Sequence, residues 1–474
     1  MSARNATLLW FRRDLRLADH EALIAAQARG GPVIPVFVCD PLVDALGAAP
    51  RWRLGLALEH LARRLEDKGS RLVLRRGNAL EVLRALARET GADAVYWSRA
   101  YDPDAIARDT AVKTALTQDG IVAHSHTGHL LFEPWTVQTG AGGFYRVYSP
   151  FWKAVRGRDV ATPLDEPATL RAPVRWPDGD ALPDWRLGRG MNRGAAVCLP
   201  YQRAGEAAAL ERLHSFTDGP IAHYRARRDI PGVEGTSGVS DNLALGEISP
   251  RRCWQAGRRA LEQGGGDGAE TWLKELVWRE FAYHLAFHTP HIVSRNWRAA
   301  WDDFPWNDNE DDPRVTAWQQ GRTGEPFVDA AMREMYVTGK MHNRGRMIVA
   351  SYLTKHLMCH WRIGQRWFDD CLTDWDPASN AMGWQWAAGS GPDAAPYFRV
   401  FNPATQLEKF DPDSRYRDRW IAEGQDNPGR SALSYFEAVP RSWHLDPTAP
   451  YPGRIVGLAE GRARALQAYK ARSF

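Results

Sequence analysis

Three stretches in the second half of the sequence combine tryptophans with carboxylates, an asparagine and arginines. They read WREF at 278–281, MHNRGRM at 341–347 and GWQWAAGSGPDAAPYFRVFNP at 383–403. Indole rings offer flat stacking faces, carboxylates and amides bond the polar edge of a heterocycle, and the arginine fork suits phosphate. This mixture suits a protein that holds a flat redox-active ring, accepts a flat base-like substrate and binds the phosphates beside it.

The first of these stretches belongs to a predicted helix over residues 270–288, where apolar residues recur at helical spacing. Glu275, Trp278 and Arg279 stand at i, i+3 and i+4, so they share one face. A surface Glu–Arg pair beside a half-buried tryptophan would explain them without any function. The alternative is the wall of a site for one planar ligand.

The second stretch lies at the start of a predicted helix over residues 343–359, which follows another over 327–339. Asn343 and Met347 are one turn apart and face the same way. An exposed polar helix would explain its arginines, but it would not need Met347 beside Asn343. Because an amide both donates and accepts, Asn343 could bridge two ligands.

The third stretch, DWDPASNAMGWQW at 374–386, places Asp374 and Asp376 before Asn380, Trp384 and Trp386. The acidic and amide groups could bond a heterocycle edge, and the indoles could stack or donate electrons. An Asp-Pro turn that caps a helix would account for Asp376 but not for the two tryptophans.

A fourth stretch, GTSGVSDN at 235–242, could present hydroxyls and backbone N–H groups to a phosphate. In isolation a Ser/Gly loop of this kind is more typical of an ordinary turn. Ser249-Pro250 then has the pattern of a helix N-cap followed by proline at the first helical position.

The elements before these stretches form two groups. Short β-branched runs alternate with helical patterns over about residues 6–128, which predicts a doubly wound, Rossmann-like parallel sheet. The predicted strands are residues 6–11, 33–38, 71–75, 93–98 and 121–125. No GxGxxG follows the first of them, so a dinucleotide site of that type is not supported. Glycines, prolines and missing periodicity mark 129–205 as a linker, and 206–474 is predicted all helical.

Composition restricts the class of protein. The 474 residues favour two domains, and no apolar run approaches the ~20 residues of a membrane span. Five scattered cysteines form no CxxC or zinc spacing, which favours a reducing cytoplasm and no metal site. The net charge of +4 is a mild basic bias that is consistent with an anionic partner. Only eight of the 61 basic residues are lysine; arginine suits phosphate recognition, but a GC-rich genome that favours arginine codons is the better explanation of this excess.

Taken together, the residues resemble the photolyase/cryptochrome family, and within it the class I photolyases of cyclobutane pyrimidine dimers (CPDs). The resemblance rests on WFRRDLRLADHEAL, RRDIPGVEGTSGVS, WLKELVWREF, TGKMHNRGRM and the block at 383–403, in that order. It implies an α/β antenna domain, a linker and a helical FAD domain. It also implies a monomeric lyase in which blue or near-UV light drives an electron from reduced FAD to a CPD flipped out of UV-damaged DNA.

The resemblance assigns roles by motif. The residues implied to bind FAD are Tyr224, Thr236, Ser237, Gly238, Val239, Ser240, Trp272, Arg346, Asp374, Trp375, Asp376 and Asn380. Those implied to form the lesion pocket are Glu275, Trp278, Asn343, Met347 and Trp386. Trp384, Trp361 and Trp306 match the chain of tryptophans that photoreduces the flavin, and Arg228, Arg279, Arg344, Arg399 and Gln406 match DNA contacts.

Two relatives of this type are alternatives, and a third is excluded. A (6-4) photolyase would carry a histidine pair where this chain has Asn343 and Met347. A cryptochrome-like light sensor would often lose pocket residues that are present here. The iron–sulfur branch needs four late cysteines, and none follows Cys371.

Some positions depart from the family pattern. Gly238 replaces a basic residue, Lys340 is unusual, and Ala381-Met382 stands where Asn-Gly is common. The usual folate pattern is absent at residues 101–105. The second, antenna chromophore is therefore left open between a differently bound folate, a deazaflavin, another flavin and an empty site.

Overall fold

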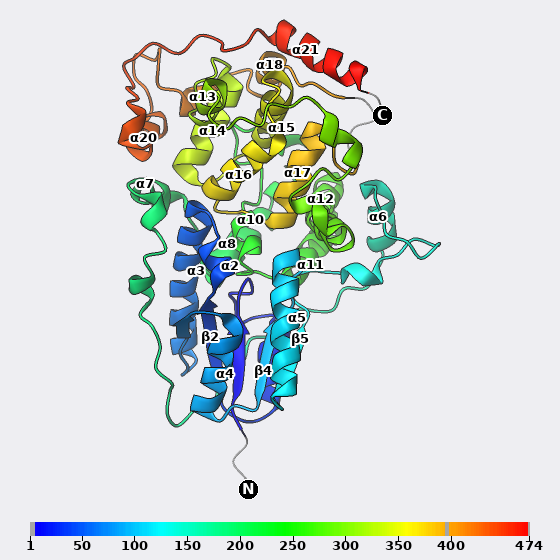
Figure 1. The fold of residues 1–474 in the computed structure, drawn as a ribbon, viewed down its shortest axis with the longest axis vertical. Coiled ribbons are helices and arrows are strands. Elements are labelled where there is room, and N and C mark those ends of the chain that lie inside the picture. Colours follow the sequence, from blue (N-terminus) through cyan, green and yellow to red (C-terminus); the bar gives the residue numbers. More distant parts are fainter. Residues whose placement is uncertain (1–4, 394–397, 473–474) are drawn as a thin grey trace.

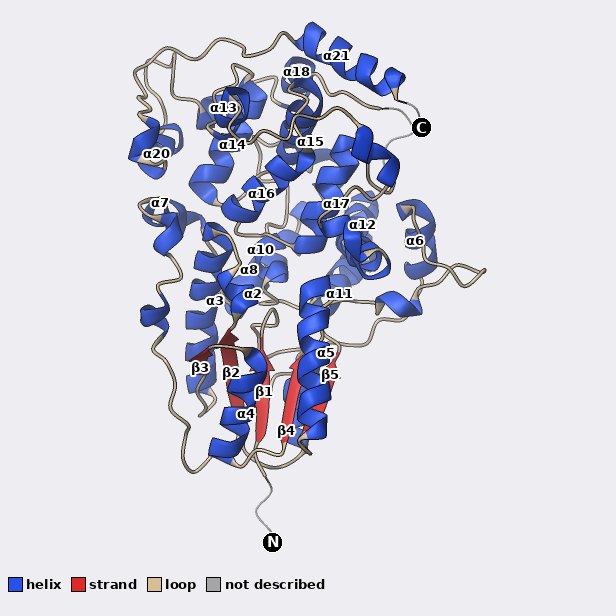
Figure 2. Cartoon of the chain, in the orientation of Figure 1, coloured by secondary structure: helices blue, strands red, loops and turns tan. Residues whose placement is uncertain are grey.

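The computed structural model describes residues 5–393 and 398–472, so residues 394–397 of the block at 383–403 lie outside it. A sheet covered by helices forms one end of the molecule, and a larger all-helical part forms the other (Figures 1 and 2). The predicted combination of an α/β domain and a helical domain is confirmed.

The sheet has five parallel strands in the order β3-β2-β1-β4-β5. They are β1 Thr7–Phe11, β2 Val33–Cys39, β3 Val73–Arg76, β4 Ala94–Ser98 and β5 Val122–His126. Each lies within two residues of its predicted bounds. In β1 and β2, where every residue is buried, a short apolar run between turn signals marks the strand, whereas β5 is an edge strand with exposed and half-buried residues.

Helices cover both faces of the sheet, which is why its central strands are buried on both sides. Leu9 and Phe11 of β1 pack with α1 and α3, whereas Leu8 and Trp10 pack with α4 and α5. The helices of this part are α1 Glu21–Ala28, α2 Pro41–Asp44, α3 Ala48–Asp67, α4 Ala79–Thr90 and α5 Pro103–Gln118.

The segment over 129–205 contains more structure than a linker. It forms α6 (Tyr148–Val155), α7 (Gly194–Cys198) and several short 3-10 turns. Its middle runs along the sheet part, where Leu170, Trp185 and Leu187 pack into the same core as α3. This packing could not be predicted from the sequence, because the apolar residues involved are isolated in the chain and form no helical or strand-like pattern.

The helical part holds the remaining elements around two large hydrophobic clusters. They are α8 Glu206–Thr217, α9 Tyr224–Arg227, α10 Ser240–Ala244, α11 Pro250–Ala260, α12 Gly266–His288, α13 Pro313–Gln319, α14 Pro326–Thr338, α15 Asn343–Ser351, α16 Trp361–Cys371, α17 Pro377–Ala388, α18 Pro403–Phe410, α19 Arg415–Trp420, α20 Arg430–Ala438 and α21 Leu458–Ala471. The helix predicted over 343–359 is corrected: α15 ends at Ser351, and a single wider π turn follows over Tyr352–His356.

The π turn buries the polar side chains of Lys355 and His356, and both of them contact backbone carbonyl groups of a distant loop. Lys355 donates to the carbonyl of Arg399, and His356 Nε2 lies 3.0 Å from the carbonyl of Phe401. These contacts reach a distant loop, so local periodicity could not reveal them.

A buried ion pair joins the two parts of the molecule. The guanidinium of Arg53 in α3 bonds Glu247 at 3.0 and 2.5 Å, and both side chains are fully buried. Beside this pair, Gly246 has φ +68°, and a Cβ on it would come within 2.1 Å of the carbonyl of Arg13. Glycine is therefore required for the close approach of the two parts here.

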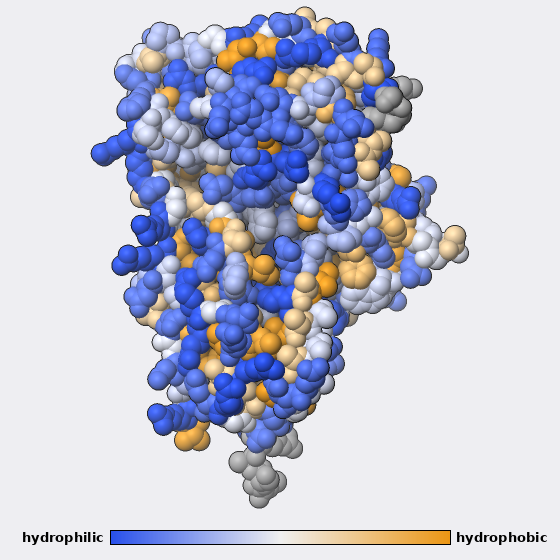
Figure 3. Space-filling model, in the orientation of Figure 1, coloured by the Kyte–Doolittle hydropathy of each residue, from blue (hydrophilic) through white to orange (hydrophobic). Residues whose placement is uncertain are grey.

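The surface view and the cysteines give no further indication of a site. The face shown in Figure 3 is mostly hydrophilic, with hydrophobic residues in several small groups. All five cysteines are free thiols. Among the helices within 5–393 and 398–472, none is long and apolar enough to cross a membrane.

Candidate cofactor and substrate site

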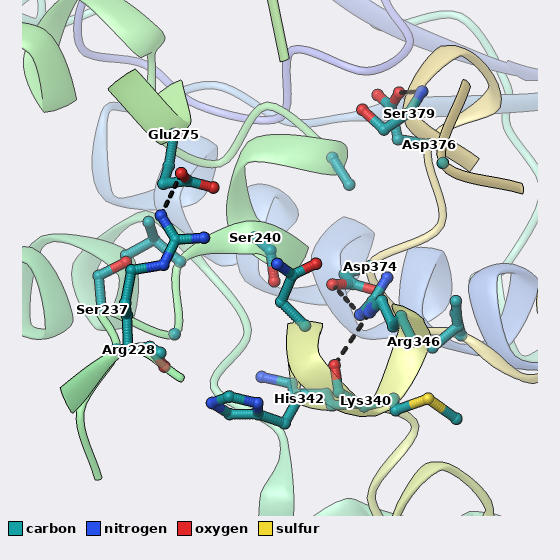
Figure 4. A pocket seen from close by; sticks show the side chains of 18 of the residues that line it. Arg228, Ser237, Ser240, Glu275, Lys340, His342, Arg346, Asp374, Asp376 and Ser379 are labelled. Atoms are coloured by element: carbon teal, nitrogen blue, oxygen red, sulfur yellow. Dashed lines mark hydrogen bonds and ion pairs between the residues drawn. The ribbon is translucent and has the colours of Figure 1, made fainter. Parts of the chain in front are cut away.

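A cavity of about 820 Å³ lies within the helical part, and all the residues implied to bind FAD or the lesion line its wall. Its wall comes from α9, α10, α12, α15 and α17 and from the segments before α10 and α17. Two sides of it are visible in Figure 4, with Glu275 beside Arg228 and, apart from them, Arg346 beside Asp374. The volume is within the ~300–1,000 Å³ of typical ligand pockets.

The loop over 235–240 forms one polar side of the cavity. The indole of Trp272 donates to Ser237 Oγ at 3.3 Å, and the hydroxyls of Thr236 and Ser240 also lie at the wall. Gly238 has φ +64°, a conformation in which most side chains are strained. Glycine adopts this conformation without strain, where a basic side chain would be strained.

Two cations to which the sequence analysis gave no role lie beside this loop, Arg212 of α8 and Lys340. Both line the cavity, and both bond the buried carboxylate of Asp241, at 2.9 and 3.0 Å. Burial would raise the pKa of Asp241, but Lys340, Arg53 and Arg212 outweigh burial and hold it below its ordinary value. The positive charge near the loop therefore comes from segments that are distant from it in sequence. The only sequence feature that pointed to this charge was the unusual lysine at position 340.

Arg346 and Asp374 form an ion pair at the opposite wall. One guanidinium nitrogen of Arg346 lies 2.9 and 2.8 Å from the two carboxylate oxygens, and Nε donates to the carbonyl of Met341 at 2.9 Å. The pair is held because Arg346 is in the first turn of α15 and Asp374 follows α16 directly.

We expect Arg346→Lys to raise the dissociation constant of FAD about fivefold. Lysine keeps the positive charge but lacks the planar guanidinium fork, and the loss of one such hydrogen bond weakens the binding free energy by roughly 1 kcal/mol. The measurement is the dissociation constant of FAD, from the fluorescence of flavin released on dilution. Arg258→Lys, an exposed position in α11, is the matched control. Equal flavin retention in both variants would contradict the assignment of Arg346.

Asn380 and Trp375 meet at a third acidic residue that the sequence did not single out. Asp369 accepts a bond from Asn380 Nδ2 at 2.7 Å and one from the indole of Trp375. Burial raises the pKa of Asp369 despite these two donors. Asp369 is in α16, so it was hidden within an ordinary helical pattern and acts here as a support for Asn380.

Asp376 caps the N-terminus of α17 and also connects the helical part to the sheet part. Its side chain accepts from the backbone N–H of Ser379 at 2.9 Å, which confirms the predicted Asp-Pro helix cap. It also accepts from the hydroxyl of Tyr283 at 2.5 Å and pairs with Arg13 at 3.0 Å. Burial would raise the pKa of Asp376, but Arg13 and these donors keep it below its ordinary value.

The lesion-pocket residues gather on α12, α15 and α17. Glu275 forms an ion pair with Arg228, and Trp278 and Trp386 are both half-buried at the cavity wall. Asn343 and Met347 line the same cavity, which agrees with their predicted common face. The wall therefore offers two indoles, a carboxylate and an amide to one ligand.

The three tryptophans of the implied electron-transfer chain are all buried. Trp384 lines the cavity, whereas Trp361 and Trp306 are buried in the core behind it. A Cβ on Gly364, one turn after Trp361 in α16, would come within 2.0 Å of the Trp384 ring. The ring of His360 lies 5.5 Å from Trp361 and 5.2 Å from Trp306.

The candidate DNA contacts separate into two sets. Arg228 and Arg279 line the cavity, and Arg279 donates to the carbonyl of His129 at 2.8 Å. The other three, Arg344, Arg399 and Gln406, are not part of its wall. Arg344 pairs with Asp229 at 2.7 Å and stacks 4.4 Å above Phe410.

Several features fit the cavity to a large, partly polar organic cofactor. His342 accepts from the backbone N–H of Arg344 through Nδ1, and burial lowers its pKa to about 4, so it is neutral with its proton on Nε2. That Nε2 and Trp384 Nε1 are buried at the wall and have no hydrogen-bond partner among the described residues. Within the part of the chain that the structure describes, no group of three or more His, Cys, Asp or Glu residues is placed to hold a metal ion. The size of the cavity and its two unpartnered donors therefore suit a large organic cofactor such as FAD.

Comparisons with known proteins agree with this geometry. Residues 7–168 match the family model of DNA photolyase, and residues 272–471 match that of the FAD binding domain of DNA photolyase. The deoxyribodipyrimidine photo-lyase of Agrobacterium fabrum (strain C58) is 45% identical, over 99% of this chain and 99% of the relative.

Two solved structures extend the agreement to the fold. A bacterial class III photolyase from Agrobacterium tumefaciens is 44% identical, with a TM-score of 0.91 over 99% of this chain and 98% of that chain. A cryptochrome from Synechocystis sp. PCC6803 is 28% identical, with a TM-score of 0.85 over 99% and 100%. The chain thus belongs to the photolyase/cryptochrome family, with its α/β photolyase domain and its helical FAD-binding domain.

Proposed function

We propose that this protein is a deoxyribodipyrimidine photolyase that uses FAD and light to split CPDs in UV-damaged DNA. The observation that supports the proposal most strongly is the shared cavity. In it, the polar FAD-type wall adjoins two half-buried indoles, Trp278 and Trp386, with a carboxylate and an amide at the same wall.

In this account, Trp278 and Trp386 stack on the flipped dimer, a base–aromatic contact worth roughly 1–3 kcal/mol per base. Met347 packs against it, and Asn343 bonds its polar edge through both donor and acceptor groups. The cavity is apolar at Leu276, Ala350 and Phe368, which excludes water and strengthens these bonds. Reduced FAD, when bound and excited by blue light, would supply the single electron that opens the dimer, and that electron would return to the flavin once the ring has split.

The Glu275–Arg228 pair has the electrostatic role. The two side chains form an ion pair, so both are already fixed at the cavity wall before the lesion enters. The positive guanidinium of Arg228 then stabilises the negative charge that develops on the dimer, without reorganisation of the protein, while Glu275 holds the guanidinium and accepts hydrogen bonds from the edge of the dimer. Arg228 and Arg279 at the cavity, with Arg344, Arg399 and Gln406 outside it, are proposed as the DNA contacts.

Other parts of the assignment are proposed with the function. The class I assignment follows from the motifs, whereas the 44% identical structure bears the class III name, and repair of CPDs is proposed in either case. The boundaries 1–128, 129–205 and 206–474 are supported by β5, which ends at His126, and by α8, which begins at Glu206. We further propose a monomer in the cytoplasm and an antenna chromophore of folate, deazaflavin or flavin type.

The test is light-dependent repair of two defined oligonucleotides, one with a CPD and one with a (6-4) lesion. The purified holoprotein, with its flavin reduced, is mixed with each and kept in blue light or darkness before chromatography. We expect restored thymines only from the CPD and only in light, because Asn343 and Met347 replace the histidine pair of (6-4) enzymes. Absence of repair from a protein that still photoreduces its flavin would instead indicate a light sensor.

A further inference from the structure

Tyr148 lies directly behind one wall of the proposed lesion pocket. Its ring stacks on the indole of Trp278 with 3.7 Å between ring centroids and 7° between planes. Tyr148 is the first residue of α6, which lies beside α12 on the flank of the molecule (Figure 1). Trp278 lines the cavity, whereas Tyr148 is buried and lies outside the cavity wall.

Tyr148 is itself fixed from several directions. Its hydroxyl donates to the carbonyl of Lys274 at 2.6 Å, one turn before Trp278 in α12. Its backbone N–H donates to Asp393 at 3.3 Å, and its ring meets Phe281 edge to face at 5.8 Å. Asp393 is in the block at 383–403 that also carries Trp386, so one residue of the linker contacts segments from both indole walls.

The rest of this segment is attached along the same helix. The backbone N–H groups of Leu131 and Phe132 donate to Glu280 at 2.7 and 3.1 Å, and that of Tyr145 donates to His284 at 3.1 Å. These bonds hold the segment against successive turns of α12, so the Tyr148 ring is placed by a rigid support rather than by a free loop.

From these contacts we infer that Tyr148 is a positioning residue, which holds the Trp278 indole in the orientation that stacks on the lesion. The inference rests on the proposed CPD repair. A parallel ring on one face of an indole leaves it one stable orientation, with its remaining surface directed at the cavity. An indole that is already ordered loses less conformational freedom when a base stacks on it.

Replacing Tyr148 should therefore weaken CPD binding about 2- to 12-fold, the factor that corresponds to the aromatic-pair contribution. Tyr148→Phe keeps the flat ring and loses only the bond to Lys274, so it should bind the CPD nearly as the unaltered protein does. Tyr148→Leu fills most of the space without a flat face and should weaken binding as Tyr148→Ala does. Affinity for undamaged DNA should be the same in all of them.

The experiment measures dissociation constants for CPD and undamaged oligonucleotides with flavin-loaded holoprotein, and flavin content by absorbance. Tyr145→Ala is the matched control, because it removes a linker tyrosine that packs on Phe151 rather than on Trp278. Tyr148→Ala is also made in a Trp278→Ala background. If Tyr148 acts through Trp278, the second substitution should cause no further loss there.

Three results would overturn the inference: unchanged CPD affinity in Tyr148→Leu, an equal loss in Tyr148→Phe, or a full additional loss in the Trp278→Ala background. If Tyr148→Ala does not fold, Tyr148→Leu decides, since leucine fills most of the space of the tyrosine ring. Failure of the proposed function would look different, because the unaltered protein itself would then show no preference for the CPD.

Discussion

Replacing Glu247 by glutamine will lower the free energy of unfolding by about 3–5 kcal/mol, because it leaves the buried Arg53 without its charged partner. Both side chains are fully buried, and Glu247 also accepts from Asn242 at 2.6 Å and from the backbone N–H of Gly205 at 2.7 Å. The nearest other carboxylate, on Asp241, is 3.6 Å from Arg53 and is shared with two further cations. The loss is followed by urea denaturation with tryptophan fluorescence.

Two comparisons make this prediction specific. Glu89→Gln breaks a surface pair with Arg75 and should cost less than about 1 kcal/mol. The double change Arg53→Met with Glu247→Leu should cost less than Glu247→Gln alone, because it leaves no buried charge unpaired. A Glu247→Gln protein as stable as the surface variant would show that the junction between the two parts does not depend on this pair.

Replacing Trp278 or Trp386 by alanine will weaken binding of CPD-containing DNA by about 1–3 kcal/mol, or roughly 5- to 150-fold. The reason is the loss of a stacking face at the cavity wall, where both indoles are half-buried. Affinity for undamaged DNA should change little, since that binding depends on phosphate contacts. Fluorescence anisotropy with matched CPD and undamaged oligonucleotides measures both.

Trp135→Ala is the matched control for these two changes, because Trp135 is 42% exposed and lies away from the cavity. Flavin content, measured by absorbance, must remain that of the unaltered protein. CPD affinity that is unchanged in both Trp278→Ala and Trp386→Ala would contradict the assignment of the indoles as the walls of the lesion pocket.

Sequence reasoning succeeded where local pattern carries the information. The strands coincide with short β-branched and apolar runs between turn signals, and all five lie within two residues of their predicted bounds. Glu275 and Trp278 share a face because residues three apart in a helix lie on the same side, and the structure places both at the cavity. The loop at 235–240 and the acidic residues before α17 likewise line this cavity.

The residues that were missed act across long separations in the chain. Tyr148 reaches Trp278 from a segment whose sequence has no periodicity, and Asp369 supports Asn380 from the middle of an ordinary helix. Arg212 approaches Gly238 from α8, which no motif connects with that loop. Such contacts are products of tertiary packing, so one sequence could not supply them.

The central claim is that one cavity holds FAD and receives the flipped dimer beside it. A crystal structure of the holoprotein with a CPD-containing duplex, frozen in darkness, tests it most directly. We predict FAD against the 235–240 loop and the Arg346–Asp374 pair, with the dimer between Trp278 and Trp386 and bonded to Glu275 and Asn343. A dimer that remains stacked in the duplex, or that lies away from these indoles, would contradict the account.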